Sequence, residues 1–331
     1  MKVLRLHAPG DLRLHDEPLP DPGPGETLVR IKAVGICGSD LHWFHEGSIG
    51  DAGLDQPLVL GHEFAGVTEA GERVAVDPAI PCEQCAWCRK GHPNLCVNMR
   101  FAGHGSQDGA LREFMAWPRR CLHPLPDSID GAEGALLEPL GVALHAVDLG
   151  KIKAGMSVGV FGCGPIGLLI LQLAKLSGAA HIVATDKLPH RVEAAKRYGA
   201  SQAISVEDGR GLGAIRAALQ GHGVDVAFEA AGEQNAVDDA FAVVIPGGKV
   251  ILAGIPDDDR TSFSASTARR KGLTIKLVRR MKHTYPRAID LVSRDLVDVR
   301  SLVTHSFSLD RAGEAFGLAQ RREGLKIMIE L

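Results

Sequence analysis

The sequence predicts an α/β fold in which a β-rich first part precedes a doubly wound parallel sheet, and three observations support this prediction. Up to about residue 140, short β-like runs alternate with Gly- and Pro-rich turns. From about Gly155 onward, apolar strands alternate with helical stretches, as in a parallel sheet. A glycine-rich turn directly follows the first of these strands. With 331 residues, the chain is long enough for about two domains, each with its own core.

The β-rich part starts with an alternating segment. The N-terminal run MKVLRLHAPGDLRLHDEP predicts a strand and hairpin rather than a secretory leader. Further strands are predicted over Leu28–Val34 and Arg73–Val76, and the turn cluster DPGPGE occupies residues 21–26. We therefore expect a β-rich domain with long functional loops, in a protein of the reducing cytoplasm.

In the second half, two kinds of segment alternate. Strands are predicted for SVGVFG, HIVATD, AIS, VDVAFEAAG, KVILAG and LTIKLV, and helices for PIGLLILQLAKLSG, PHRVEAAKRYGA and residues 214–220 and 234–244. After Val278, helical stretches over Pro286–Ser293 and Asp310–Arg321 lead to a final apolar strand, KIMIEL. This tail is expected to return to the first domain.

Composition excludes two classes of partner. Lys and Arg number 37 against 40 Asp and Glu, a net charge of −3, and no basic run long enough to follow a phosphate backbone occurs. Hydrophobic residues make up 45%, but no stretch approaches the roughly 20 apolar residues of a membrane span. The sequence therefore predicts neither nucleic-acid binding nor membrane insertion.

Four cysteines gather in the run PCEQCAWCRKGHPNLC, namely Cys82, Cys85, Cys88 and Cys96. Thiolates at this spacing can close tetrahedrally around one Zn²⁺, so that sulfur fills every coordination position. Such a site cannot bind substrate, which predicts a structural role. Disulfides or unused thiols are the alternative, but seven cysteines, an odd number, and the lack of a predicted leader disfavour disulfides.

The glycine-rich turn lies between a predicted strand and a predicted helix. In a doubly wound sheet these glycines permit a tight turn, a close approach of backbone to pyrophosphate and close helix packing, while the helix N-terminus binds the anion. The candidate cofactor-binding residues of the turn are Gly162, Gly164, Pro165, Ile166 and Gly167.

An acidic residue stands where a ribose would be bound. Asp186 ends the next predicted strand, and a carboxylate there can accept from a ribose 2′-hydroxyl but repels a 2′-phosphate. This favours NAD over NADP, although Lys187 and Arg191 are basic and soften the preference. The alternative is a glycine turn in an α/β protein that binds no nucleotide.

The β-rich half also contains a mixed set of metal-binding residue types. Cys37 lies in VGICGSDLHWF, and His62 and Glu63 lie in LVLGHEFAG. Thiolate, imidazole and carboxylate can bind Zn²⁺ and leave a position open, as catalysis requires. Glu138 lies in the apolar stretch GALLEPLGVALHA, where a nearby cation would offset the cost of burying its charge. Each residue also has a structural explanation, and sequence separation alone does not bring them together.

Five motifs in this order resemble the zinc-dependent medium-chain dehydrogenases, in their branch of sorbitol (iditol) and related polyol dehydrogenases. They are the CGSD motif, the GHE run, the four-cysteine lobe, the EPLGVALHA stretch and the GCGPIG turn. The resemblance implies a GroES-like catalytic domain over residues 1–142, with a structural zinc lobe at 80–98, and a Rossmann NAD-binding domain over residues 143–277. It further implies that residues 278–331 return to the catalytic domain, with the active site in the cleft between the two domains.

The resemblance also assigns roles. It implies that Cys37, His62 and Glu63 bind the catalytic zinc, and that Glu138 ligates it or holds its water. The polar residue Ser39, with His42, is expected to relay the proton of the alcohol. Residues implied to contact substrate are Trp43, Phe101, His104, Arg280 and Met281.

Three of these positions depart from the family pattern. Trp43 and Met281 stand where tyrosine is usual, and His104 where animal enzymes have threonine. Each change removes a hydroxyl group, so a polyol or sugar is predicted as substrate, without sorbitol being specified.

The predicted enzyme binds two zinc ions per chain, one catalytic and one structural, and NAD. By resemblance it is a homo-oligomer, either a dimer or a tetramer. Rival activities are L-threonine 3-dehydrogenase-like or sugar 1-dehydrogenase chemistry. Non-enzyme rivals are a zinc-stabilised binding module and a non-catalytic nucleotide-binding protein. The spacing of the cysteines and the acidic balance disfavour a nucleic-acid-binding zinc module.

Overall fold

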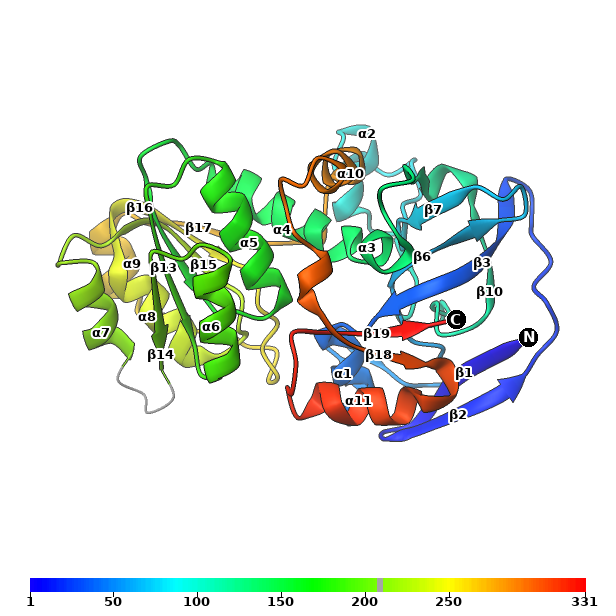
Figure 1. The fold of residues 1–331 in the computed structure, drawn as a ribbon. Helices are drawn as coiled ribbons and strands as arrows, with labels where there is room; N and C mark the ends of the chain where they lie inside the picture. Colours follow the sequence, from blue (N-terminus) through cyan, green and yellow to red (C-terminus); the bar gives the residue numbers. More distant parts are fainter. Residues whose placement is uncertain (207–210) are drawn as a thin grey trace. The chain divides into compact units, whose positions relative to one another are not determined.

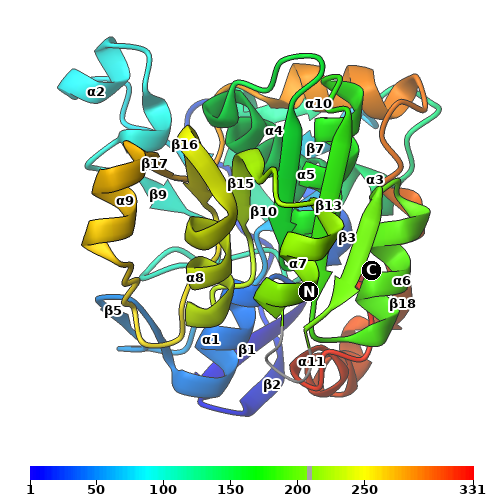
Figure 2. The ribbon, with the colours of Figure 1, turned by 90° about the vertical axis from the view of Figure 1, so that its left-hand side faces the viewer.

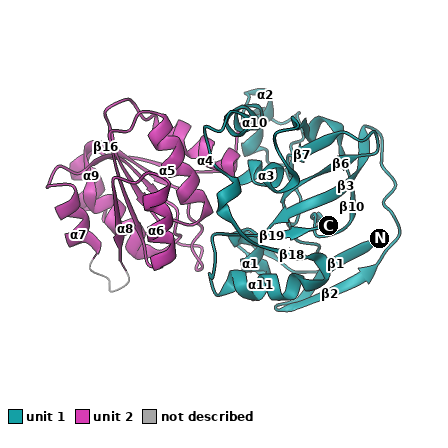
Figure 3. Cartoon of the chain, viewed as in Figure 1, with its two compact units in different colours: residues 1–139, 285–331 teal, residues 140–284 magenta. Residues whose placement is uncertain are grey.

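The computed structural model describes residues 1–206 and 211–331, which form two compact units (Figure 3). Unit 1 comprises Met1–Pro139 and Tyr285–Leu331, and unit 2 comprises Leu140–Thr284. The sequence placed the boundaries at 142 and 277. Tyr285 belongs to unit 1 because its hydroxyl donates to the carbonyl of Val76 at 2.7 Å and its ring stacks on His123 at 4.4 Å between centroids.

A mixed sheet forms the centre of unit 1 (Figure 1). Its path is β11-β7-β6-β3-β19-β18, and β10 also pairs with β3. The strands are β3 (Glu26–Gly35), β6 (Glu63–Thr68), β7 (Arg73–Val76), β10 (Phe114–Pro118), β11 (Leu122–Pro124), β18 (Val303–Ser308) and β19 (Lys326–Glu330). The strands β18 and β19, from the end of the chain, are thus part of the same sheet as β3, β6 and β7 from its beginning.

The register at the end of β3 positions the site described below. Gly35 of β3 lies opposite Glu63 of β6 on one side and opposite Met328 of β19 on the other. Strands from three distant parts of the sequence therefore meet at this point, and their side chains become neighbours.

Short elements complete unit 1. The predicted N-terminal hairpin forms as β1 (Lys2–Ala8) and β2 (Asp11–Asp16). The remaining strand pairs are β4 (Ser48–Ile49) with β5 (Ala52–Gly53), and β8 (Ala79–Ile80) with β9 (Arg100–Phe101). The helices are α1 (Gly38–Glu46), α2 (Ala86–Arg89), α3 (Gly131–Ala135), α10 (Tyr285–Ser293) and α11 (Ala312–Gln320), and α4 (Leu137–Gly150) crosses the boundary between the units.

Unit 2 is built on a parallel sheet of order β14-β13-β12-β15-β16-β17. Helices α5 and α6 pack together on one face, and α7, α8 and α9 on the other (Figure 2). The strands are β12 (Ser157–Phe161), β13 (His181–Asp186), β14 (Gln202–Ser205), β15 (Val224–Glu229), β16 (Val244–Leu252) and β17 (Thr274–Leu277). The helices are α5 (Pro165–Leu176), α6 (Pro189–Arg197), α7 (Gly211–Ala218), α8 (Gln234–Val243) and α9 (Ala265–Lys271). This is the predicted doubly wound sheet.

Several predicted boundaries were wrong. The helix expected at 214–220 is α7, which ends at Ala218 because Gln220 (φ 51°) and Gly221 (φ 80°) adopt left-handed conformations. The strand expected at KVILAG is β16, which begins earlier, at Val244, because a register irregularity opposite β15 keeps the preceding turn in the sheet. The sequence also missed α9, which Ser264 caps by accepting from the N–H of Thr267 and which ends at left-handed Gly272.

Across residues 1–206 and 211–331, no helix is both long enough and apolar enough to cross a bilayer.

Candidate active site

The mixed donor set of the sequence converges in unit 1. Cys37 immediately precedes α1, while His62 and Glu63 lie at the start of β6. The sulfur of Cys37, an imidazole nitrogen of His62 and a carboxylate oxygen of Glu63 all lie within 4.8 Å of one another. Two zinc ligands at bond lengths of about 2.0–2.3 Å must lie roughly 3–4 Å apart. This donor set therefore fits a zinc ion, whereas a purely structural explanation does not require three such groups to converge.

Asp40 holds two of these donors in place. Its Oδ2 accepts from the N–H of Cys37 at 2.9 Å, and its Oδ1 accepts from the N–H of Gly61 at 3.2 Å and lies 3.4 Å from Nδ1 of His62. Burial raises the pKa of Asp40, but His62 and the two N–H groups outweigh burial and hold that pKa below its usual range. A carboxylate behind Nδ1 leaves Nε2 as the coordinating nitrogen.

Glu63 is bound by a buried lysine. Nζ of Lys326, on β19, donates to both carboxylate oxygens of Glu63 at 2.8 and 2.7 Å and to the carbonyl of Ile36 at 2.9 Å. The side chains of Lys326 and Glu63 are only 3% and 2% exposed. Glycine is required at position 35, opposite Glu63, because an added Cβ there would collide with Oε2 of Glu63.

Glu138, in the first turn of α4, lies in the same buried region and is 6% exposed. Burial raises the pKa of Glu138 to about 7, while His62 and Lys326 favour its charged form and Glu63 opposes it. Its carboxyl group is not among the donors within 4.8 Å of one another.

The predicted relay residues lie on α1. Oγ of Ser39 lies 3.4 Å from Nε2 of His62, on the side of the donor set. Nδ1 of His42 is 3.7 Å from a carboxylate oxygen of Glu46, one turn further along the same helix. Ser39 is therefore next to the donor set, and His42 is directed along α1.

The predicted aromatic residues of the substrate pocket lie in unit 1, and one of them packs beside the donor set. The ring of Phe101 lies 5.3 Å from that of His62, and the ring of His104 meets Trp43 edge-on at 5.6 Å, centroid to centroid. Trp43 is 1% exposed and belongs to the hydrophobic core of unit 1. The buried ring of Trp43 therefore packs against the ring of His104, which is more exposed to solvent than Trp43.

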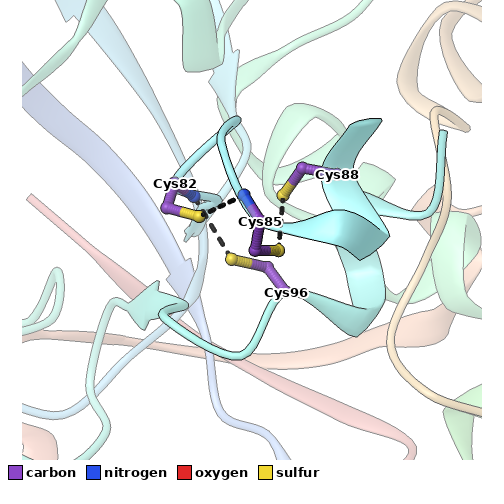
Figure 4. Close-up of side chains that lie close together, drawn as sticks. All are labelled: Cys82, Cys85, Cys88 and Cys96. Carbon is purple, nitrogen blue, oxygen red and sulfur yellow. Dashed lines mark hydrogen bonds between the residues drawn. The ribbon is translucent and has the colours of Figure 1, made fainter. Parts of the chain in front are cut away.

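The four cysteines of the lobe also converge (Figure 4). All seven cysteines of the chain are free thiols, and the four sulfurs of the lobe lie within 4.8 Å of one another, with Cys85 and Cys88 at 3.5 Å. Sulfurs bound tetrahedrally at about 2.3 Å lie about 3.8 Å apart. A backbone hydrogen bond at Cys88 is the main reason that the pKa of Cys85 falls to about 6. The lobe fits a fully sulfur-coordinated zinc, and the disulfide alternative has no support.

The glycine turn of unit 2 has the conformation that its sequence requires. Gly162 has φ 97°, and an added Cβ would lie 2.7 Å from the backbone nitrogen of Ala231. An added Cβ at Gly167 would collide with the carbonyl of Gly162. At Gly164, which precedes Pro165 and Ile166 of α5, an added Cβ would first meet the guanidinium of Arg191, 3.6 Å away. Packing therefore explains two of these glycines, and the third leaves space beside a cation.

Asp186 is tied to the same turn. Its Oδ2 accepts from the N–H of Cys163 at 2.7 Å and its Oδ1 from the N–H of Leu188 at 2.8 Å. Lys187, by contrast, forms an ion pair with Glu233. The carboxylate is thus fixed at the end of β13, while one of the two neighbouring cations is neutralised.

Arg280 and Met281 belong to unit 2. Arg280 has φ 54°, a left-handed conformation. Met281 packs against α4, because an added Cβ at Gly141 would lie 2.6 Å from its sulfur.

Asp40 and Lys326 are site residues that were not predicted from the sequence. Asp40 stands in the CGSD motif beside Ser39, so its place in the motif was an available signal. Lys326 had no such signal, because only the pairing of β19 with β3 brings it to Glu63.

Two family models match the chain. The alcohol dehydrogenase GroES-like domain covers residues 23–127, and the zinc-binding dehydrogenase model covers residues 165–294. Sorbitol dehydrogenase of Bacillus subtilis is 35% identical over 99% of this chain and 97% of the relative, and that of Macaca fascicularis is 37% identical over 99% and 95%.

Solved structures agree over the full length. A zinc-binding dehydrogenase of Sinorhizobium meliloti bound to NADP is 31% identical with a TM-score of 0.91, covering 100% of this chain and 99% of that one. An Escherichia coli alcohol dehydrogenase complexed with NADH is 28% identical (TM-score 0.92, 100% and 99%). The 2R,3R-butanediol dehydrogenase of Bacillus subtilis is 30% identical (TM-score 0.88, 100% and 99%).

Proposed function

This chain belongs to the zinc-dependent medium-chain dehydrogenases, in their sorbitol dehydrogenase-like branch, and from that premise we propose that it oxidises a secondary hydroxyl group of a polyol or sugar with NAD⁺ as hydride acceptor. The protein is an oxidoreductase of the zinc-dependent polyol dehydrogenase type, with a small-molecule substrate.

One observation carries the proposal: the convergence of Cys37, His62 and Glu63. These residues would hold the catalytic zinc. A zinc bound there supplies Lewis acidity, which lowers the pKa of a bound alcohol. A mixed set of three protein donors leaves a position for that alcohol, whereas the four thiols of the lobe leave none.

The protein's own groups position and deprotonate the alcohol. Ser39, next to His62, would accept the proton of the alcohol and pass it towards His42. Burial raises the pKa of Glu138 to about 7. Its carboxyl group would form a hydrogen bond to the water or alcohol at the open position. Asp40 would hold His62 with Nε2 directed at the donor set.

The nucleotide site in unit 2 favours NAD. The N–H groups at the start of α5 and the cation of Arg191 beside Gly164 would bind the pyrophosphate. Asp186 would accept from ribose hydroxyls and repel a 2′-phosphate. The ion pair of Lys187 with Glu233 removes one cation that a 2′-phosphate would need.

We propose that Phe101 and His104, which packs against Trp43, contact the substrate in unit 1. The substrate contacts of Arg280 and Met281 stay predictions from the family resemblance. The imidazole of His104 offers one donor and one acceptor to a hydroxylated substrate. Sugar alcohols, vicinal diols and aldoses are the classes to be tested first, with L-threonine as the main alternative.

A combined assay tests these assignments. The purified protein should contain two zinc ions per chain and reduce NAD⁺ with at least one member of a panel of sugar alcohols, vicinal diols, aldoses and L-threonine. If NAD⁺ is reduced only with L-threonine, the proposed substrate class is wrong and an amino acid takes its place. One zinc ion and no turnover above background would contradict the proposed function.

Cofactor choice has a separate test. In Asp186→Ala, kcat/KM with NAD⁺ should fall by about tenfold while kcat/KM with NADP⁺ falls less or rises. An equal fall for both cofactors would contradict the role of Asp186 in discrimination.

The homo-oligomer implied by the family remains a prediction. Light scattering coupled to size-exclusion chromatography would give the mass directly, and a mass near the 35.2 kDa of one chain would contradict it.

A further inference from the structure

Lys326 is a buried cation that the chemistry proposed above does not use. It is 3% exposed, and its Nζ donates to Glu63 and to the carbonyl of Ile36, next to Cys37, at the edge of the donor set. A buried lysine is costly unless it is paired, so a simple structural explanation would be that it forms one ion pair. That ion pair, however, involves Glu63, which is itself a member of the donor set.

With zinc bound by Cys37, His62 and Glu63, the carboxylate of Glu63 would be shared between the metal ion and Lys326. A carboxylate has two oxygens with about four lone pairs, so it can accept from an ammonium group and bind a metal ion at the same time. Here the ammonium group reaches both oxygens, at 2.8 and 2.7 Å. Every lone pair that faces Lys326 is unavailable to zinc, and the electron density left for the metal is reduced.

The backbone fixes this arrangement. Glu63 and Met328 lie opposite Gly35 on its two sides, and an added Cβ at Gly35 would collide with Oε2 of Glu63. Lys326 also donates to the carbonyl of Ile36. The ammonium group is therefore held at one distance from Glu63 by three strands.

Charge balance gives a reason for a cation at this position. With Cys37 as thiolate, the donor set and the adjacent Asp40 carry three anions, namely Cys37, Glu63 and Asp40, while Glu138 lies outside the donor set. Without Lys326 they would exceed the charge of Zn²⁺ by one, and with Lys326 the sum is neutral. A site with excess negative charge binds zinc more tightly but makes it a weaker Lewis acid.

We propose that Lys326 is a positioning residue that competes with the catalytic zinc for Glu63, keeps Glu63 a weak ligand and so leaves a coordination position available to the alcohol. The inference depends on the proposed zinc role of Cys37, His62 and Glu63. It assigns to the C-terminal strand a part in setting the reactivity of the metal.

Zinc release separates this role from a purely structural one. The rate at which zinc is lost to a chromogenic chelator is measured in the wild type, Lys326→Met and Lys326→Arg. Cys37→Ser is measured in parallel, and the kinetic phase of zinc release that is missing in this variant is assigned to the buried site. In Lys326→Met that phase should be at least about tenfold slower, since a competing cation close to the ligand has been removed. The kcat/KM for the alcohol should fall by about tenfold as well, and Lys326→Arg should restore both values to within about threefold.

A matched control is Lys271→Met in unit 2. Nζ of Lys271 also makes three hydrogen bonds, at 3.0, 2.8 and 2.8 Å, but to the carbonyls of Phe241, Ala242 and Val244 and to no carboxylate. This variant should lose thermal stability and leave the zinc-release phase unchanged.

The outcomes are distinct. Unchanged or faster zinc release in Lys326→Met would overturn the inference, because loosening is what loss of a structural contact produces. If the wild type has no release phase that depends on Cys37, the proposed function itself fails. If Lys326→Met does not fold, Lys326→Gln, which keeps donors but no charge, must still slow the release, and a wild-type rate there would overturn the inference.

Discussion

The two candidate zinc centres of unit 1 are built in opposite ways. The lobe takes four identical donors from the single stretch 82–96, and the side chains of three of them are partly exposed. The other centre takes three different donors, from the residue before α1 and from the start of β6 with the residue before it. It is largely buried and is bound by Lys326, which is 263 positions from Glu63 in the sequence. The lobe is a local structure, and the buried centre is a tertiary one.

The two centres therefore differ in whether they can take part in catalysis. Four thiolates satisfy the metal completely, so the lobe needs no surrounding charges and offers no open position. The mixed centre is incomplete by itself and is surrounded by groups that adjust it, namely Asp40 behind His62 and Lys326 behind Glu63. Such outer residues decide orientation and reactivity.

Removing a donor from the buried centre should have the largest effect. In Cys37→Ser, turnover should fall by at least about a thousandfold, because the metal that acts as Lewis acid is lost or displaced. Zinc analysis should show one ion fewer per chain, while NADH still binds by fluorescence titration. Survival of turnover would show that the buried centre is not the catalytic one.

Removing a donor from the lobe should affect stability instead. Cys85→Ser should lower the free energy of unfolding by about 3 kcal/mol, because zinc binding contributes to folding of the lobe. The kcat should stay within about threefold of the wild type, and the zinc of the buried centre should be retained. The control Val97→Ser, at a lobe position that is 69% exposed, should change neither. A large loss of kcat in Cys85→Ser at unchanged stability would erase the distinction between the centres.

A substitution at a residue that contacts a donor of the buried centre should have an intermediate effect. Asp40→Asn should reduce zinc affinity at the buried centre by about 10- to 100-fold, because the amide no longer fixes the orientation and charge of His62. Competition with a chelator measures this affinity, and the zinc of the lobe provides an internal reference. Glu69→Gln, an exposed acid after β6, is the control. Equal weakening of both centres would indicate general unfolding rather than a positioning role.

The smallest effect concerns the acid sensitivity of unit 1 outside the two centres. Burial lowers the pKa of His123, which stacks on Tyr285, below its ordinary 6.5. The unfolded chain therefore takes up a proton at a higher pH than the folded one, and stability is lost as pH falls from 6.5 through the lower folded pKa. In His123→Phe this loss should be reduced, by less than about 1 kcal/mol since the ring is only partly buried. Urea unfolding between about pH 8 and pH 5 measures it. If the free energy of unfolding of His123→Phe depends on pH as in the wild type, the assignment of this pH dependence to His123 is contradicted. The control Val97→Ser should keep the pH dependence of the wild type.

Local patterns predicted much of the molecule. The alternation of strands and helices after Gly155 predicted the doubly wound sheet, because each strand and helix there has its own period and punctuation. The same holds for the glycine turn, where Gly162 and Gly167 occupy positions that no side chain could. Helix ends were predicted less well, as α7 shows, because left-handed terminal residues such as Gln220 are not glycine.

The lobe could be predicted from the sequence alone, since Cys82, Cys85, Cys88 and Cys96 lie close enough in the chain for their spacing to define tetrahedral coordination. The sequence also named Cys37, His62 and Glu63 as candidates, through residue type and motif. Only the tertiary structure decided that these three meet, that Asp40 stands behind His62, and that Lys326 binds Glu63. The physical reason is that contacts between β3, β6 and β19 depend on strand register across the whole of unit 1, and no spacing within one segment encodes register.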